Sequence, residues 1–119
     1  MIYSITAKHF RSFCDELAKL KSRWEMSGWR MTAAHCQLAD DVWAMCNVDL
    51  EGRSVHFRLN TETDTAFTDA WARHCARHEM AHAILEPLQT MAGRRTVTQD
   101  QITAAEHEVI QRLMGLLPK

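Results

Sequence analysis

The feature that most constrains this chain is a long stretch, residues 65–86, that contains neither glycine nor proline. Such a stretch predicts one uninterrupted helix, because the two residue types that most often break helices are absent from it. Thr61, Thr63 or Asp64 can cap its start. We expect the helix to end at Pro87, because proline disfavours the helical conformation in the residue before it.

Residues 78–82 of this stretch read HExxH, with His78, Glu79 and His82 at the fixed positions. Two imidazoles four residues apart lie on one face of a helix, where both can bind a single zinc ion. Glu79 projects about 100° further around the helix, so it can contact a water molecule without being a ligand. Composition alone would produce this pattern roughly 0.03 times in such a chain. The simpler alternative is a solvated helix that happens to carry these side chains.

A catalytic zinc site needs a third protein ligand, because such sites use three ligands and leave one position for water. His74 lies on the same helical row, but it is about 12 Å from His82 along the helix axis, at 1.5 Å per residue. Cys75 fails for the same reason. We therefore interpret His74 as an ordinary polar residue and Cys75 as a packing residue.

Glu106 is the better candidate for the third ligand. It falls on or beside the apolar stripe of a predicted final helix, where an unpaired carboxylate would be unfavourable unless a cation lay against it. The alternative is a carboxylate at the edge of the stripe with its oxygens in water. Glu108 is predicted to be solvated.

The rest of the chain predicts an α+β fold with one N-terminal helix and a small sheet. Apolar residues at spacings of three and four predict a helix over residues 6–26. Alternating and β-branched runs predict strands over 29–33, 42–48 and 54–59. Gly52 suits a hairpin between the last two strands, so we expect a three-stranded, mainly antiparallel meander. Thr98 and Gln101 form a capping-box pattern that starts the final helix.

Composition limits the classes of function. A chain of 119 residues with 46% hydrophobic content predicts a single domain over residues 1–119. A formal charge of −1 with scattered basic residues argues against nucleic-acid and anionic-membrane partners. The N-terminus has no export signal, and no apolar run is long enough to span a membrane.

The four cysteines have no CxxC spacing, which indicates reduced thiols in a cytoplasmic protein. Cys36 and Cys46 lie on neighbouring predicted strands and could meet across the sheet. Packing as small apolar side chains is the alternative role for both.

His78, Glu79 and His82, followed by Glu106 in a later helix, are similar to the gluzincin arrangement. The short chain and its order of elements look like the minimal gluzincin-type metallopeptidase domains found in phages and prophages, which would place it in the host cytoplasm. The resemblance implies one Zn²⁺ per chain, bound by His78, His82 and Glu106. It also implies that a zinc-activated water hydrolyses a peptide or protein substrate, with Glu79 as general base.

The same resemblance implies that the strand over residues 54–59 is the edge with which an extended substrate pairs. Groups that orient the two histidines or stabilise the oxyanion are also needed. Tyr3, His56, Arg58 and His107 are all conceivable in these roles.

Two other classes of function compete with the peptidase. A non-catalytic adaptor or regulator could keep the zinc as a folding staple and bind a partner protein, although a purely structural site has no need of Glu79. A helical protein without metal would leave Glu106 unexplained.

Overall fold

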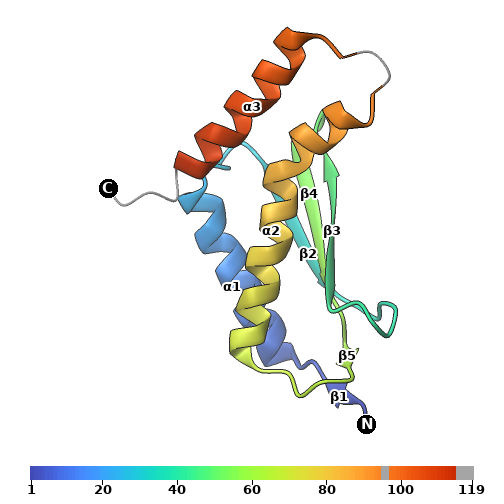
Figure 1. The fold of residues 1–119 in the computed structure, drawn as a ribbon. Helices are drawn as coiled ribbons and strands as arrows, with labels where there is room; N and C mark the ends of the chain where they lie inside the picture. The colour runs from blue at the N-terminus through green and yellow to red at the C-terminus, as the bar shows by residue number, and fades with distance from the viewer. Residues whose placement is uncertain (95–96, 115–119) are drawn as a thin grey trace.

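In residues 1–94 and 97–114, which the computed structural model describes, three helices and two small sheets form an α+β fold (Figure 1). This is the fold class that the sequence predicts. None of the described helices is long and apolar enough to cross a membrane. The elements in chain order are β1 (Tyr3–Ser4), α1 (Ala7–Arg23), β2 (Arg30–His35), β3 (Ala44–Asp49), β4 (Ser54–Leu59), β5 (Glu62–Thr63), α2 (Asp69–Ala92) and α3 (Gln99–Met114).

The main sheet has the order β2-β4-β3, so the strand with the most buried residues lies in the centre. β3 and β4 form the predicted antiparallel hairpin, in which Arg53, and not Gly52, has a positive φ of 48°. The predicted meander is wrong, because β2 pairs with β4 in parallel, from Arg30 opposite Ser54 to His35 opposite Leu59. The connection over residues 36–43 carries the chain past β4, and β3 returns on the far side. A small second sheet pairs β1 with β5.

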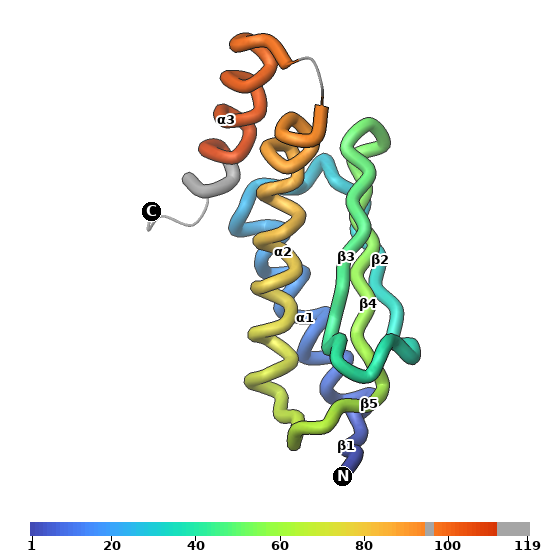
Figure 2. The backbone as a smooth tube through the Cα atoms, turned by 45° about the vertical axis from the view of Figure 1, so that its right-hand side comes forward, coloured from blue at the N-terminus to red at the C-terminus, as the bar shows by residue number. Residues whose placement is uncertain are grey.

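The two long helices cover one face of the main sheet, with α1 against β2 and α2 against β3 (Figure 2). Val55, Phe57 and Leu59 of β4 point into this layer and are at most 1% exposed, as is Phe13 of α1. The other face of the sheet is polar. The strand that contributes most to the core is therefore also the one that is paired on both sides.

Local capping signals set the starts of the helices. Thr6 and His9 cap each other at the start of α1, and the Thr68 hydroxyl accepts a bond of 3.1 Å from the Trp71 amide at the start of α2. The predicted caps of α2, a few residues earlier, are therefore wrong. The Thr98 and Gln101 capping box forms as predicted at the start of α3.

α2 does not end at Pro87, as predicted, but continues to Ala92. Pro87 is buried, so its packing offsets the loss of one helical hydrogen bond, that from its own position to the Ala83 carbonyl. Figure 1 shows the last turns of α2 bending away from the direction of the rest of the helix. The helix is thus continuous through the proline, at the expense of straightness.

α3 packs on α2 through only part of its predicted apolar stripe. Ala105 and Val109 are buried, whereas Ile102 and Ile110 are 40% and 44% exposed. Leu116 and Leu117, which complete the predicted stripe, lie outside the described residues. α3 therefore leaves a row of large apolar side chains facing outward.

Asn60, just after β4, ties down the connection that precedes β3. Its amide group donates to the carbonyls of Ala39 and Val42 at 3.1 and 2.7 Å, and its side-chain oxygen accepts from the Leu38 amide at 3.0 Å. Its own backbone amide donates to the carbonyl of Trp43 at 2.8 Å. The side chain is 1% exposed, so these bonds are shielded from water. One residue thus fixes the position of Trp43 at the start of β3.

The Asn60→Asp variant should lose about 2–4 kcal/mol of unfolding free energy, because it replaces two buried donors with an oxygen that faces two carbonyl groups. Urea denaturation followed by circular dichroism measures this loss. Asn47→Asp, on the exposed face of the sheet beside Arg58, is the matched control and should change stability by less than about 0.5 kcal/mol. Equal stabilities for the two variants would contradict the role assigned to Asn60.

Candidate metal centre

The packing of α2 decides which of its residues face outward. Ala72, Ala76, Met80 and Ala83 are fully buried and follow the helical period. His78 lies two residues before Met80, about 200° away around the helix, and is exposed. The same helical geometry places His82 beside His78 on the outward side.

An ion pair between α2 and α1 restricts the rotation of α2. Arg77 donates through Nε to Oε2 of Glu16 on α1 at 2.9 Å. Because Glu16 is buried, this contact holds the side of α2 that faces α1. The neighbouring residue His78 is consequently held on the outer side.

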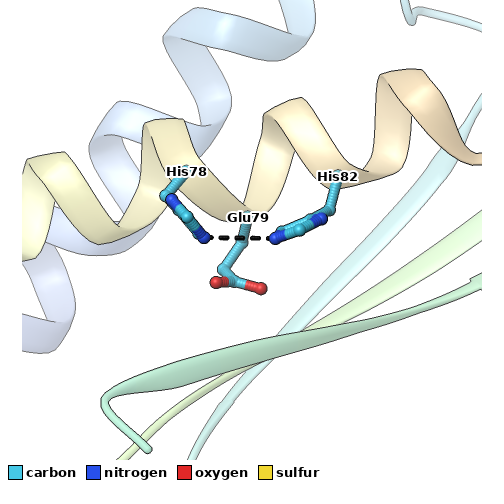
Figure 3. A group of neighbouring side chains, drawn as sticks. All are labelled: His78, Glu79 and His82. Atoms are coloured by element: carbon cyan, nitrogen blue, oxygen red, sulfur yellow. Dashed lines mark hydrogen bonds between the residues drawn. The ribbon is translucent and has the colours of Figure 1, made fainter.

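The two imidazoles of the HExxH sequence converge. Nε2 of His78 and Nε2 of His82 are 3.1 Å apart, and their ring centroids are 4.8 Å apart (Figure 3). Two nitrogen ligands about 2.05 Å from a tetrahedral zinc ion would be about 3.3 Å apart, so this pair fits a shared zinc ion. One ligand atom from each of His78, Glu79 and His82 lies within 4.8 Å of the others. These three residues form a possible metal-binding group.

Glu79 lies at the border between the outward and the buried side of α2. It is 8% exposed, and Figure 3 shows its carboxylate on the same side of the helix as the two imidazoles. Burial raises the pKa of this carboxyl group, while His78, His82 and the thiol of Cys46 lower it. The group is thus a carboxylate in a partly dehydrated setting, beside nitrogen atoms suited to a cation.

Two thiols surround Glu79 from the sheet and from the preceding helical turn. Cys46 of β3 donates to the Glu79 main-chain oxygen at 3.5 Å. Burial, followed by the charge of Glu79, raises the pKa of Cys46 to about 12 and that of Cys75 to about 11. Both thiols are therefore protonated at neutral pH in the metal-free protein. Cys75 is buried, in keeping with its predicted packing role.

Sequence reasoning missed Cys46 as a neighbour of Glu79. The alternation of β3, in which Ala44, Cys46 and Val48 share the inward face, was the signal that could have found it. Cys36 and Cys46 do not face each other across neighbouring strands, because β4 lies between β2 and β3.

Glu106, the predicted third ligand, is not part of the group that the structure brings together. Among the described residues, the group that could hold a metal ion consists of His78, Glu79 and His82. Glu106 is exposed on α3, and Figures 1 and 2 show α3 on the side of α2 away from the main sheet. Its role as a ligand stays a prediction.

The candidates for orienting the histidines or stabilising the oxyanion lie in different parts of the structure. His56 and Arg58 point to the outer face of the sheet, where they bond Thr32 and Asn47. Because alternate residues of a strand face opposite sides, the structure does not bring either of these candidates to the metal-binding group. Tyr3 lies in the small second sheet. His107 lines a separate pocket that includes Trp29.

The prediction that β4 offers a free edge to a substrate is also wrong, because β4 is the central strand. The edge strand beside α2 is β3. Trp43 accepts a backbone bond from Asn60, and the alternation of an antiparallel pair then directs the backbone groups of Ala44, Cys46 and Val48 away from β4. In the described residues no strand pairs with this edge.

A cleft of about 360 Å³ adjoins the metal-binding group. Residues 41–44 line it from the sheet side, and His74, Cys75, His78 and Glu79 line it from α2. His74, which is too far along the helix to share a metal with His82, instead packs edge-on against Trp71 at 5.4 Å. The cleft and the possible metal site thus share two side chains.

Comparison with known proteins adds no family assignment: no family model matches the chain, and no curated protein or solved structure is detectably similar to it. The resemblance to gluzincins therefore depends on the HExxH spacing and on the group formed by His78, Glu79 and His82.

Protein purified without a histidine tag should contain about one zinc ion per chain, and His78→Ala should abolish this binding, because it removes one of the two converging imidazoles. Elemental analysis of dialysed protein measures the zinc content. His74→Ala removes an exposed histidine one turn away and is the matched control, which should keep its zinc. Folded wild-type protein that binds no zinc would overturn the metal centre.

Proposed function

We propose that this protein is a zinc-dependent peptidase in which His78 and His82 bind the metal and Glu79 is the general base. The observation that supports this most is the 3.1 Å separation of the two Nε2 atoms, with the carboxylate of a buried Glu79 beside them. A metal that only stabilises the fold needs imidazoles but no adjacent carboxylate. The combination therefore favours hydrolysis over a purely structural role.

When bound, zinc would supply Lewis acidity that makes water a nucleophile near neutral pH and polarises the scissile carbonyl. Glu79 accepts the proton that this water loses as its oxygen attacks the carbonyl carbon. The same carboxyl group then delivers the proton to the leaving nitrogen as the C–N bond breaks. Partial burial suits Glu79 to both steps, because a dehydrated carboxylate is a stronger base than one in water.

The free edge of β3 is where we propose that the substrate backbone lies. Ala44, Cys46 and Val48 direct their backbone groups to this edge, and an extended peptide can pair with such groups. Cys46 contacts Glu79, so a peptide on this edge would pass close to the base. Main-chain pairing of this kind accepts many sequences, and side-chain pockets must then provide selectivity.

We also propose that Glu106 completes the zinc site after a shift of α3. Glu106 lies seven residues after the first residue of α3, and Leu85 lies seven residues before the last residue of α2. If the two helices ran antiparallel with their connected ends level, Glu106 would lie at the level of Leu85, one turn from His82.

The apolar surface supports such a shift. Ile102 and Ile110, one turn to either side of Glu106, are exposed on α3, and Leu85 and Leu88 are exposed on α2. A roll of α3 that buried these side chains against one another would remove apolar surface from water and turn Glu106 toward the histidines.

The Glu79→Gln variant should keep its zinc and its unfolding midpoint but lose about 10²–10⁴-fold in turnover, because the amide cannot accept a proton. Cleavage of a diverse peptide library by wild type and variant, read by mass spectrometry, measures this. Equal turnover by the two proteins would show that Glu79 is not the base. A zinc-loaded wild type that cleaves nothing would instead favour the adaptor, since the same imidazoles can hold zinc as a folding staple.

The Glu106→Gln variant should bind zinc about tenfold or more weakly than wild type, because it removes an anionic ligand. Competition with a chromophoric chelator measures the affinity. Glu108→Gln, on the same helix, is the control for a general effect of losing one negative charge. Equal affinities for the two variants would exclude Glu106 as a ligand and leave α3 where the structure has it.

A further inference from the structure

One wall of the cleft beside the metal-binding group is formed by Trp43, whose ring packs against two other aromatic rings. Trp43, at the start of β3, lines the cleft and meets Trp71 of α2 edge-on, with ring centroids 5.0 Å apart. Phe67 packs against the other side of Trp43 at 5.9 Å, also edge-on. Edge-to-face contacts of this kind hold rings in fixed orientations. The wall is therefore already organised before any ligand binds.

The wall remains accessible to a ligand. Trp71 is 40% exposed, although it contacts two other rings, and Trp43 is only partly buried. Val42, Ala44 and Cys75 supply further apolar surface within the cleft. Exposed aromatic surface next to a concave apolar lining is the usual composition of a pocket for an apolar side chain.

The charges in the cleft disfavour one class of ligand. Its ionisable lining groups are the carboxyl groups of Asp41 and Glu79, the two imidazoles of His74 and His78, and the protonated thiol of Cys75. Asp41 and Glu79 both line this space, so their carboxylates would weaken the binding of an acidic side chain. An aromatic ring carries no charge and can pack edge-on or face-on against Trp43.

The position of the cleft links it to the bond that would be cleaved. His78 and Glu79 belong both to the cleft and to the metal-binding group. Ala44, which is the first residue of β3 and of its free edge, also lines the cleft. A substrate backbone on that edge with its scissile carbonyl near Glu79 would thus place a neighbouring side chain in the cleft.

We propose that this cleft binds a large aromatic side chain of the peptide substrate, at a residue adjoining the scissile bond, and that Trp43 determines this preference. The inference rests on the proposed function for the identity of the reacting bond. The aromatic selectivity itself follows from the cleft and can be measured by binding alone. Trp43 touches the substrate side chain, and Asn60 positions it through the backbone bond described above.

The test uses zinc-loaded Glu79→Gln protein, which binds peptides without cleaving them, and three peptides that differ only by Phe, Ala or Asp at one position. Fluorescence anisotropy of labelled peptides should give tighter binding for the Phe peptide than for the Ala and Asp peptides. Replacing Trp43 by Leu keeps an apolar side chain but removes the ring. This change should weaken binding of the Phe peptide about tenfold and leave the Ala peptide within about twofold.

The controls separate a local effect from a loss of folding. Met45→Leu, on the outer face of β3, should leave all three affinities unchanged, and zinc content and thermal unfolding should match in every variant. Equal binding of the Phe, Ala and Asp peptides by the parent protein would overturn the proposal. So would a uniform loss for all peptides in the Trp43→Leu variant, since a general defect is not selectivity.

The outcome is distinguishable from failure of the peptidase proposal. Selective binding that depends on Trp43, together with no cleavage by wild type, would support the aromatic preference of the cleft and contradict the peptidase proposal. Cleavage of the library without any aromatic preference would support the peptidase proposal and contradict the proposed preference of the cleft.

Discussion

The burial of one face of α2 is the constraint on which the rest of the structure depends. Ala72, Ala76 and Ala83 are small enough to let the helix approach both α1 and the sheet, and Met80 fills the space between them. Because each residue advances the helix by about 100°, this packing determines the direction of every other side chain on it. The histidines converge outside because the alanines are inside. A rotation of α2 by one residue would bury an imidazole and expose part of the core.

The electrostatics of the same region point to a cation. Glu79 is largely withdrawn from water, yet the adjacent guanidinium of Arg77 lies on the other side of the helix and binds Glu16. Cys46 and Cys75 are neutral and add only weak polarity around the carboxylate. A dehydrated carboxylate is stabilised most by a nearby positive charge, and a metal ion held by His78 and His82 would provide it. The carboxylate and the two imidazoles together thus form a possible metal-binding group.

Local sequence signals predicted what local physics controls. The capping box at Thr98, the hairpin between β3 and β4 and the convergence of His78 with His82 all depend on residues a few positions apart, and all form as predicted. The convergence of the two histidines was therefore predictable from the sequence, whereas the predicted third ligand, Glu106, lies outside the group that the structure brings together. The neighbours of this group on the sheet side, Trp43 and Cys46, were not visible in the sequence, because they lie near the group only through tertiary packing.

The predictions that were wrong depend on how segments far apart in the sequence pair or pack. Nothing local reveals that β2 pairs with β4 in parallel, and that choice makes β4 central and turns His56 and Arg58 to the outer face. Whether Glu106 approaches the histidines depends in the same way on how one helix packs against another.

Pro87 gives α2 two mechanically different parts. Before Pro87 the helix packs against α1 and the sheet, and this packing holds the backbone of His78 and His82 in place. At Pro87 one hydrogen bond is lost, and the last turns of α2 bend. The 16 residues of α3 follow this bend in the chain. α3 is about 24 Å long at 1.5 Å per residue, so a tilt of about 10° about its own first residue would move its other end by about 4 Å. The chain can thereby adjust what α3 brings toward the site while the two imidazoles stay in place.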